Sequence, residues 1–465
     1  MERIENKINK KYLYGYVFAI VLGSFQFGFS LSSFNPIMRI IVKIYKWEDE
    51  TQIALYSGLI STIIPFGGFI GSSFVGFFAE RERRKLVYFY NFLIILGSLI
   101  LQIENIYALV AGRLFQGFGI GVAAMISPKI IREISPKQIA GLLGTLHQFM
   151  LATGIVFPMI LTLGMPHSNE GIEKNQIWRA IFLFPTLISC IQLTLFFSIY
   201  SLDTPYFYMI KEDKINLSKS MKCIYWDKDE RDSALMDLQK LIGSSGKSKN
   251  IKLIDLLGKE FIKPLIVGVT LNFFQQASGI NVITFYSSII FSDHGKHNPA
   301  IPNLIFTSLK ALAVLIAFFT IEKLGRTRIT FLGSIFLGSF LVLIGVSFNL
   351  SLFIINVIVI TFFGLSYAFS FGPITWIYCA EILPPIGLSV TMSVNLICVC
   401  FIVFFTPILL NILHQYFFYI FTFFMLCAAI FSIYFMPETK GLSDLEIKRL
   451  FAGSEMSLEK EEDEI

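Results

Sequence analysis

The chain has 465 residues, of which 54% are hydrophobic, only 15% are charged and 49 are phenylalanine. A soluble domain usually carries about 25% charged residues, so this composition excludes an ordinary soluble protein and indicates a membrane protein. The net charge of +5 reflects basic loops beside a membrane and does not imply a nucleic-acid partner.

Long apolar segments recur along the chain. A membrane-spanning helix needs about 20 mostly apolar residues, and twelve segments meet this requirement. They are 13–34, 53–78, 86–103, 106–131, 139–164, 179–201, 264–292, 301–321, 329–348, 352–380, 386–411 and 414–436. We therefore expect an all-α membrane protein with twelve transmembrane helices.

The distribution of Lys and Arg predicts the orientation. With both termini in the cytosol, thirty of the 38 basic residues are cytosolic and six are outside. This asymmetry follows the positive-inside rule and favours cytosolic termini. The two remaining residues, Arg113 and Lys310, lie inside apolar segments, where a charge is costly. We expect Arg113 to be a buried charge.

Similar loop sequences occur in both halves of the chain. Glu80–Arg84 is followed 242 residues later by Glu322–Arg326. The residues around Glu133 and Glu381 are offset by 248, and Asp203-Thr204 and Glu438-Thr439 by 235. A near-constant offset indicates two six-helix repeats related by an axis along the membrane normal.

The predicted boundaries follow from this repeat and from the long polar stretch between segments six and seven. They are a cytosolic N-terminus (1–12), an N-terminal six-helix bundle (13–201), a cytosolic linker of short amphipathic helices (202–262), a C-terminal six-helix bundle (263–437) and a cytosolic tail (438–465).

Three motifs carry a family resemblance: Gly144–Gln148 (GTLHQ), Gln275–Asn281 (QQASGIN) and Pro437–Gly441 (PETKG). In combination they resemble the sugar porter family of the major facilitator superfamily, especially facilitative glucose transporters. The resemblance implies two pseudo-symmetric six-helix halves and transport of a hexose such as glucose by alternating access. It also implies a plasma-membrane location. We expect a sugar and the lipid bilayer as partners, and a monomeric functional unit.

Amide side chains inside apolar segments are the candidate substrate ligands. A polar group at this depth is costly unless it meets a partner, and an amide both donates and accepts hydrogen bonds, as a sugar hydroxyl does. Helix–helix amide bonding is the alternative. The resemblance implies that four amides and Trp376 contact the sugar, and we expect Asn395 to replace a polar position of segment eleven. The four amides are Gln148, Gln275, Gln276 and Asn281.

Gly279 is expected to interrupt segment seven between Gln276 and Asn281, because transporter sites form at broken helices. About one turn beyond Asn281, Phe285 and Tyr286 resemble the outer gate of the family, which usually has two tyrosines.

Lys310 stands where the family usually has a sugar-contacting Asn. It could donate to sugar hydroxyls, favour an anionic solute such as a sugar phosphate, or extend toward the outer water. An intramembrane Lys is a functional candidate by default, so we include it in the predicted site and keep the three possibilities open.

Acidic residues are absent from the cores of all twelve segments. Proton-coupled members of the family usually place Asp in segment one, where this chain has Ser30. We therefore expect uniport. Proton-coupled symport, carriage of inositol or another polyol or anion, and a non-transporting sugar receptor are the alternatives.

The resemblance also implies a cytosolic salt-bridge latch, in which Arg and Glu pair between the two halves in the outward-facing state. Its candidate residues are Arg83, Arg84, Glu133, Glu322, Arg326, Glu381 and Glu438. Because Ala140 and Leu388 stand where Arg is usual, we expect a larger inward-facing population than in a typical member.

Enzyme chemistry has little support in the sequence. It contains no Gly-rich phosphate loop, no Cys/His spacing typical of a metal site and no arrangement that suggests a catalytic triad. We expect neither a cofactor nor a metal ion.

Overall fold

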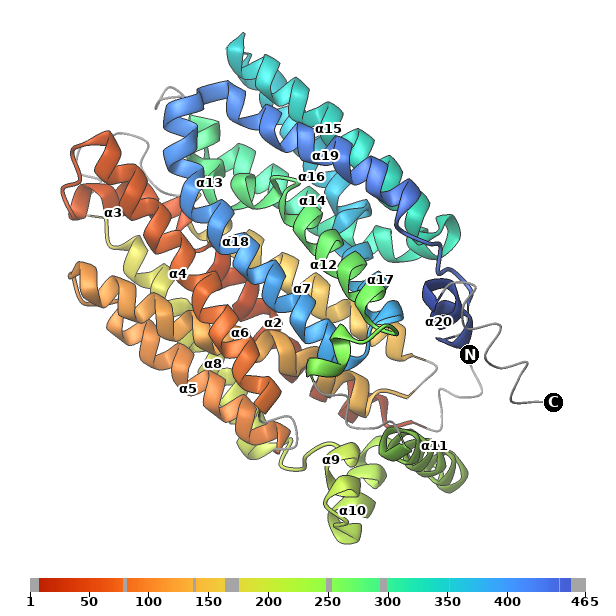
Figure 1. Ribbon diagram of the computed structural model, residues 1–465. Helices are drawn as coiled ribbons and strands as arrows, with labels where there is room; N and C mark the ends of the chain where they lie inside the picture. Colours follow the sequence, from red (N-terminus) through yellow and green to blue (C-terminus); the bar gives the residue numbers. More distant parts are fainter. Residues whose placement is uncertain are drawn as a thin grey trace. The chain divides into compact units, whose positions relative to one another are not determined.

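The computed structural model describes residues 8–77, 82–136, 139–163, 175–247, 253–292, 299–350, 352–442 and 444–452. Helices predominate in these ranges, and the one β pairing within them is an isolated antiparallel bridge between Ile8 and Tyr225 (Figure 1). The expectation of an all-α protein is confirmed.

The first six apolar segments correspond to six long helices. They are α2 (Lys10–Ser32), α4 (Glu50–Phe77), α5 (Arg83–Ile100), α6 (Ile106–Ile134), α7 (Ala140–Leu161) and α8 (Ile177–Ser198). A 3-10 turn (Asn35–Ile37) and the short helix α3 (Met38–Ile44) follow α2. Asn105 caps the N-terminus of α6, where its side chain accepts the amide N–H of Tyr107 at 2.8 Å.

The last six segments form eight helices, because the seventh and tenth are each broken. They are α12 (Ile262–Gln276) with α13 (Ile280–Ser292), α14 (Ala300–Leu324), α15 (Arg326–Asn349), α16 (Phe353–Phe369) with α17 (Phe371–Ile382), α18 (Pro385–Leu413) and α19 (Phe417–Tyr434). By length and composition alone, nine spans among the described residues could cross a membrane, and one of them, Ile386–Tyr434, covers both α18 and α19.

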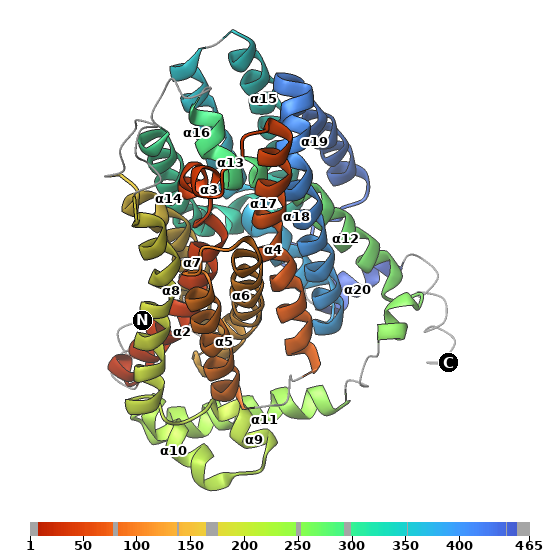
Figure 2. The ribbon, with the colours of Figure 1, turned by 90° about the vertical axis from the view of Figure 1, so that its left-hand side faces the viewer.

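The linker forms α9 (Pro205–Ile210), α10 (Lys214–Ile224), α11 (Lys228–Lys247) and a 3-10 turn (Leu253–Leu257), and α20 (Asp444–Ala452) follows α19. Two linker helices start at side-chain caps: Thr204 precedes Pro205 at the first turn of α9, and Asp213 accepts the N–H of Asn216 at 3.0 Å. Figure 2 shows α9 to α11 beyond the end of α5.

The chain divides into two compact units, each with its own apolar core. The first comprises Met1–Trp47 with Ile63–Asn250, and the second comprises Glu48–Thr62 with Ile251–Ile465. Ile64, Ile94 and Ile120 are fully buried in the first core, whereas Phe306, Leu337 and Phe363 are fully buried in the second. Within the second unit α15 and α19 lie side by side (Figure 1).

Glycines bring α4 and α6 together in the first unit. A Cβ atom on Gly117 would lie 2.6 Å from the carbonyl oxygen of Ile64, and one on Gly67 would lie 2.7 Å from that of Leu114. Small residues of this kind allow close helix packing in membranes.

Candidate functional site

Four buried or half-buried amides form one hydrogen-bonded network in the second unit. Asn281 on α13 donates to Gln276 Oε1 at 2.5 Å, and Gln276 on α12 donates to Asn395 Oδ1 at 2.8 Å. Asn395 on α18 donates in turn to Gln275 Oε1 at 2.7 Å. The fold thus brings together four of the amides that the sequence singles out.

Asn272 belongs to the same network, although sequence reasoning missed it. Its Oδ1 accepts a hydrogen bond from Asn395 at 3.0 Å, and its Nδ2 donates to the carbonyl of Gly268 at 2.9 Å. Residues four apart share one face of a helix, so the spacing from Asn272 to Gln276 is the signal that could have revealed it.

Gln275 connects this network to the break in segment ten. Its Nε2 donates to the carbonyl oxygens of Phe371 at 2.9 Å and Gly372 at 3.3 Å. The break lies at Ser370, whose φ of −120° and ψ of −100° are not helical. Trp376 is partly buried and lies one turn after Gly372 on α17.

The expected interruption of segment seven is confirmed, and Gly279 makes it possible. Its φ of +81° is in the region that favours glycine, and a Cβ there would lie 3.2 Å from the ring of Phe421. Ser278 Oγ donates to the carbonyl of Gln275 at 2.6 Å across the break. The break separates α12 from α13 and allows Asn281 to reach back to Gln276.

The network leaves hydrogen-bonding capacity unused at one end. An amide offers two N–H donors and an oxygen acceptor. Among the described residues, Asn281 Oδ1 has no hydrogen-bond partner, and Gln276 Nε2 makes one hydrogen bond. Asn281 is also partly exposed. This end can therefore donate to and accept from a ligand without giving up its internal bonds.

Lys310 contacts α13, the helix that carries the exposed end of the network. Its Nζ on α14 donates to Thr284 Oγ1 at 3.2 Å and lies 5.6 Å from the centroid of the Phe306 ring. Thr284 follows Asn281 by three residues on α13, and residues three apart share a helix face. Among the described residues Lys310 has no carboxylate partner. The ammonium group therefore retains donors for another acceptor.

The two residues proposed for the gate, Phe285 and Tyr286, are 3% and 0% exposed. Tyr286 donates its hydroxyl to the carbonyl of Val403 on α18 at 2.8 Å. This bond ties α13 to α18, and a gating role for the pair stays a prediction.

Gln148 lies in the first unit, on α7, and its side chain is exposed. It has no hydrogen bond to a described residue, whereas its neighbour His147 is buried and bonded through Nδ1 to Ser24 Oγ at 2.6 Å. A contact between Gln148 and the sugar stays a prediction.

Arg113 is completely buried in the first unit, as expected. Its guanidinium donates to Ser33 Oγ at 2.9 Å and to the carbonyl of Ser30 at 3.3 Å. It also lies 5.6 Å from the ring centroid of Phe34 and 6.0 Å from that of Phe182. These four neighbours are uncharged.

Both units contain the same charged cluster at matching positions. In the first, Arg83 donates to Glu133 at 2.8 Å, and Thr204 donates to the other carboxylate oxygen at 2.6 Å. In the second, Arg326 donates to Glu381 at 2.7 Å and Thr439 does so at 2.6 Å. The repeat seen in the loops is therefore also a repeat of contacts.

These ion pairs form within each unit, so the latch residues already have partners in their own half. Glu438 accepts the backbone N–H of Arg326 at 2.8 Å, and Arg84 donates to the hydroxyl of Tyr88. The side chain of Glu322 lies outside the described residues. Pairing between the halves stays a prediction.

Asp203 is a further member of the first cluster, which sequence reasoning did not place in the site. Its carboxylate accepts the N–H of Arg84 at 3.2 Å, as Glu438 accepts that of Thr327, the residue after Arg326, at 3.1 Å. The offset of 235 residues between the two loops is the signal that could have identified it. Burial raises the pKa of Asp203 to about 6 although hydrogen bonds from Thr204 and Arg84 act in the opposite direction.

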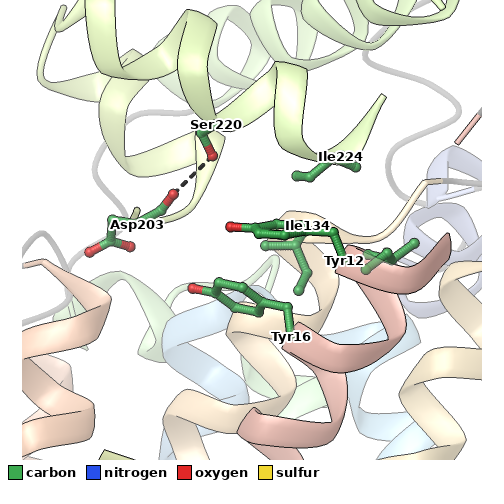
Figure 3. Close-up of a pocket in the computed structure, with 7 residues that line it drawn as sticks. Tyr12, Tyr16, Ile134, Asp203, Ser220 and Ile224 are labelled. Atoms are coloured by element: carbon green, nitrogen blue, oxygen red, sulfur yellow. Dashed lines mark hydrogen bonds between the residues drawn. The ribbon is translucent and has the colours of Figure 1, made fainter. Parts of the chain in front are cut away.

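A small pocket lies beside Asp203 (Figure 3). Its volume of about 10 Å³ suits at most one water molecule, so it is too small for a solute. The hydroxyl of Tyr16, which lines it, has no partner among the described residues.

Comparisons with known proteins agree with this architecture. The family model described as sugar (and other) transporter matches residues 16–451. Hexose transporter 1 of Plasmodium vivax (strain Brazil I) is 28% identical over 453 residues, covering 92% of this chain and 90% of the relative. Facilitated glucose transporter member 2 of solute carrier family 2 from Rattus norvegicus is 26% identical over 494 residues, covering 94% and 93%.

Two solved structures share the fold. The inward open xylose transporter XylE from E. coli superimposes with a TM-score of 0.80 at 19% identity, over 94% of this chain and 99% of that chain. The proton:xylose symporter XylE of the major facilitator superfamily, bound to 6-bromo-6-deoxy-D-glucose, gives 0.76 at 20% identity, over 95% and 100%. The chain therefore belongs to the sugar (and other) transporter family, a family of carriers and not of enzymes, and is an integral multi-pass membrane protein with the major facilitator fold.

Proposed function

We propose that this protein carries a hexose such as glucose across the membrane by passive uniport, with alternating access between its two halves. The observation that carries the proposal is the buried amide network of Gln275, Gln276 and Asn395, which ends at the partly exposed Asn281. Relatives described as hexose and facilitated glucose transporters support the same substrate class.

The chemistry of the network suits an uncharged polyol. A sugar hydroxyl donates one hydrogen bond and accepts others, so it can satisfy the free Asn281 oxygen and the second Gln276 N–H together. The internal bonds of the network hold both amides in place before the sugar arrives. Such preorganisation reduces the entropic cost of binding.

Replacing Gln276 and Asn281 by Leu tests the site. We expect hexose uptake by proteoliposomes to fall at least about tenfold, since a buried hydrogen bond to an uncharged partner contributes about 0.5–1.5 kcal/mol. Gln415→Leu is the matched control, because Gln415 is an amide of the same unit whose one side-chain hydrogen bond to a described residue goes to the exposed Asn349, at 3.4 Å. Full-speed uptake by a correctly inserted double variant would refute the proposed site.

Uniport is proposed because the described hydrogen bonds of Arg113 go to uncharged groups, the Ser33 hydroxyl and the Ser30 carbonyl. A proton symporter needs a titratable group that both sides of the membrane reach in turn, and no Asp or Glu occupies a segment core. We expect proteoliposomes to reach equal internal and external hexose concentrations with or without a pH gradient. Uphill accumulation after acidifying the outside would establish symport instead.

A second candidate function, carriage of an anionic polyol such as a sugar phosphate, is favoured by Lys310, which lies beside Thr284 and has no carboxylate partner among the described residues. A panel of glucose, inositol and glucose 6-phosphate separates the two. If Lys310 serves a neutral sugar, Lys310→Asn retains glucose uptake and glucose 6-phosphate is not carried by either protein. If it serves an anion, the substitution abolishes uptake of the phosphate.

The proposal includes a plasma-membrane location, cytosolic termini and a monomeric functional unit. Terminal epitope tags that antibodies reach only after permeabilisation of the cell would support the orientation. Uptake of any panel solute would also exclude the non-transporting receptor.

A further inference from the structure

A second, larger cavity lies in the linker, between α10 and α11. Its volume is about 410 Å³, which is in the size range of small-molecule sites. The groove is lined by nine residues of these two helices. All of these residues belong to the first unit, so the groove is formed within one compact part of the chain.

The lining of the groove is strongly basic. Four cationic side chains, Lys214, Lys222, Lys228 and Arg231, face one acidic residue, Asp232. None of the four cations forms an ion pair with a described residue. Four unpaired cations around one cavity create a strongly positive potential and favour a ligand with several negative charges.

This charge is a product of the fold and not of local composition. Residues 205–239 contain six basic and seven acidic side chains, so the segment as a whole is nearly neutral. One of the acidic residues, Asp213, does not line the groove: its carboxylate caps α10 through the N–H and Nδ2 of Asn216. Four of the six basic residues line the groove, against one of the seven acidic residues.

The lining of the groove also includes a hydroxyl group and apolar side chains. Among the lining residues Met221 is buried and Leu217 and Leu235 are half-buried, while Ser218 contributes an exposed hydroxyl. Arg231 presents a planar fork that matches two oxygens of a phosphate, and Lys side chains act as point charges for the others. This is the chemistry of a site for phosphate esters.

The groove lies next to the predicted membrane surface. The N–H of Asn9, at the start of transmembrane helix α2, donates to the carbonyl of Ile224 at 2.9 Å, and Ile8 pairs with Tyr225. Immediately beyond, Trp226 is 69% exposed, and Ile215 at the start of α10 is 71% exposed. Figure 2 shows α10 and α11 beyond the ends of the long helices of this unit. Exposed Trp is typical of a membrane–water interface.

We propose that this groove binds the phosphorylated head group of an anionic lipid in the cytosolic leaflet. Lys214, Lys222, Lys228 and Arg231 hold the phosphates, and Trp226 and Ile215 contact the adjoining lipid. A polyphosphorylated inositol lipid fits the four cations best, because a single phosphodiester leaves most of them without a partner. The side that carries the linker is the one that the Lys and Arg distribution assigns to the cytosol.

The test uses the purified full-length protein in a neutral detergent. Short-chain phosphatidylinositol 4,5-bisphosphate is titrated, with short-chain phosphatidylcholine as reference, and binding is measured by thermophoresis or native mass spectrometry. We expect binding of the first lipid only, weakening as salt rises from about 50 to about 500 mM. The double variant Lys222→Glu/Lys228→Glu should bind at least about tenfold more weakly, since each basic residue near a lipid surface contributes about 1 kcal/mol.

Two control variants keep the result interpretable. Lys211→Glu/Lys219→Glu makes the same change in net charge on exposed residues outside the groove and should bind as the wild type does. Lys222→Arg/Lys228→Arg retains the charges and should also bind, so a loss caused by misfolding is recognised. Salt-insensitive binding, or an equal loss in the Lys211/Lys219 control, would overturn the proposal.

A soluble phosphate ester tests whether the ligand is a lipid at all. If inositol hexakisphosphate binds the groove while the short-chain lipid binds no more tightly than phosphatidylcholine, the ligand is a soluble phosphate ester and the lipid assignment is wrong. Displacement of bound lipid by inositol hexakisphosphate, at a higher concentration than the lipid itself requires, supports it.

Discussion

At the residue scale, Asn395 is the centre of the candidate site. It accepts from Gln276 and donates to Gln275 and Asn272, so three buried amides depend on one side chain. Such a node satisfies polar groups that would otherwise be costly at membrane depth. The amides of segment seven that the family resemblance singled out lie in one network, whereas their contact with a sugar stays a prediction and their partner on α18 departs from the usual family pattern.

Asn395→Leu should therefore destabilise the protein more than an ordinary surface substitution. Leaving a buried polar group without a partner costs about 1–3 kcal/mol, and three amides lose a bond here. We expect a loss of at least about 2 kcal/mol in the free energy of unfolding in detergent. Asn349→Leu, at an exposed amide, is the control, and equal stability of the two variants would show that the network does not support the fold.

At the element scale, the broken helices position the site. Segment seven breaks at Gly279, and segment ten breaks at Ser370, two residues before the glycine of its Gly-Pro pair. The first break was predictable because glycine tolerates a positive φ. In segment ten the irregular conformation lies at Ser370, the residue before α17 begins, and not at Pro373.

Gly279→Ala should lower both stability and transport. The φ of +81° strains any L residue, and the added Cβ lies 3.2 Å from the Phe421 ring, so we expect a loss of about 1–2 kcal/mol. Gly338→Ala is the matched control in the same unit, because its Cβ would meet nothing closer than Met425 at 3.5 Å in a regular helix. Thermal unfolding and hexose uptake are measured on both, and an unchanged Gly279 variant would contradict the proposed strain.

The loop element around Asp203 should make stability depend on pH. Its folded-state pKa is about 6 against an ordinary 3.8, so the folded protein binds this proton more readily than the unfolded chain does. The resulting stabilisation is complete below about pH 4 and is lost as pH rises through about 6. This pKa difference of about two units corresponds to a stabilisation of about 3 kcal/mol at most.

We therefore expect the unfolding temperature of the wild type to rise between about pH 7 and about pH 5 relative to that of Asp203→Asn. The amide of this variant cannot titrate, so the difference between the two proteins isolates the Asp203 carboxylate from the other acidic groups. A difference that stays constant across this range would show that Asp203 has an ordinary pKa.

At the scale of the whole molecule, the repeat was the most predictable feature. Arg83, Glu133 and Thr204 correspond to Arg326, Glu381 and Thr439, and the ion pairs have nearly equal lengths of 2.8 Å and 2.7 Å. Loop motifs at constant offset predicted this because each half folds as the same unit. The basic groove on the linker was not predictable, since its charge depends on which side chains α10 and α11 turn toward each other.

The repeated ion pairs also bear on the balance between the inward-facing and outward-facing conformations. Glu133 and Glu381 already bind arginines of their own halves, so a latch between halves needs additional cations, and Ala140 and Leu388 do not supply them. Exposed ion pairs contribute about 0–1 kcal/mol each, so two of them, about 2 kcal/mol at most, shift a two-state equilibrium by up to about thirtyfold.

We accordingly expect the apo wild type to populate an open cytosolic side, and Ala140→Arg/Leu388→Arg to close it. Double electron–electron resonance between spin labels on the cytosolic ends of the two halves measures both populations. Ala140→Gln/Leu388→Gln is the control, because it adds side-chain length without charge and should leave the distances unchanged. A closed cytosolic side in the apo wild type would mean that within-half pairs like Arg326–Glu381 are accompanied by cross-half contacts strong enough to replace the missing arginines.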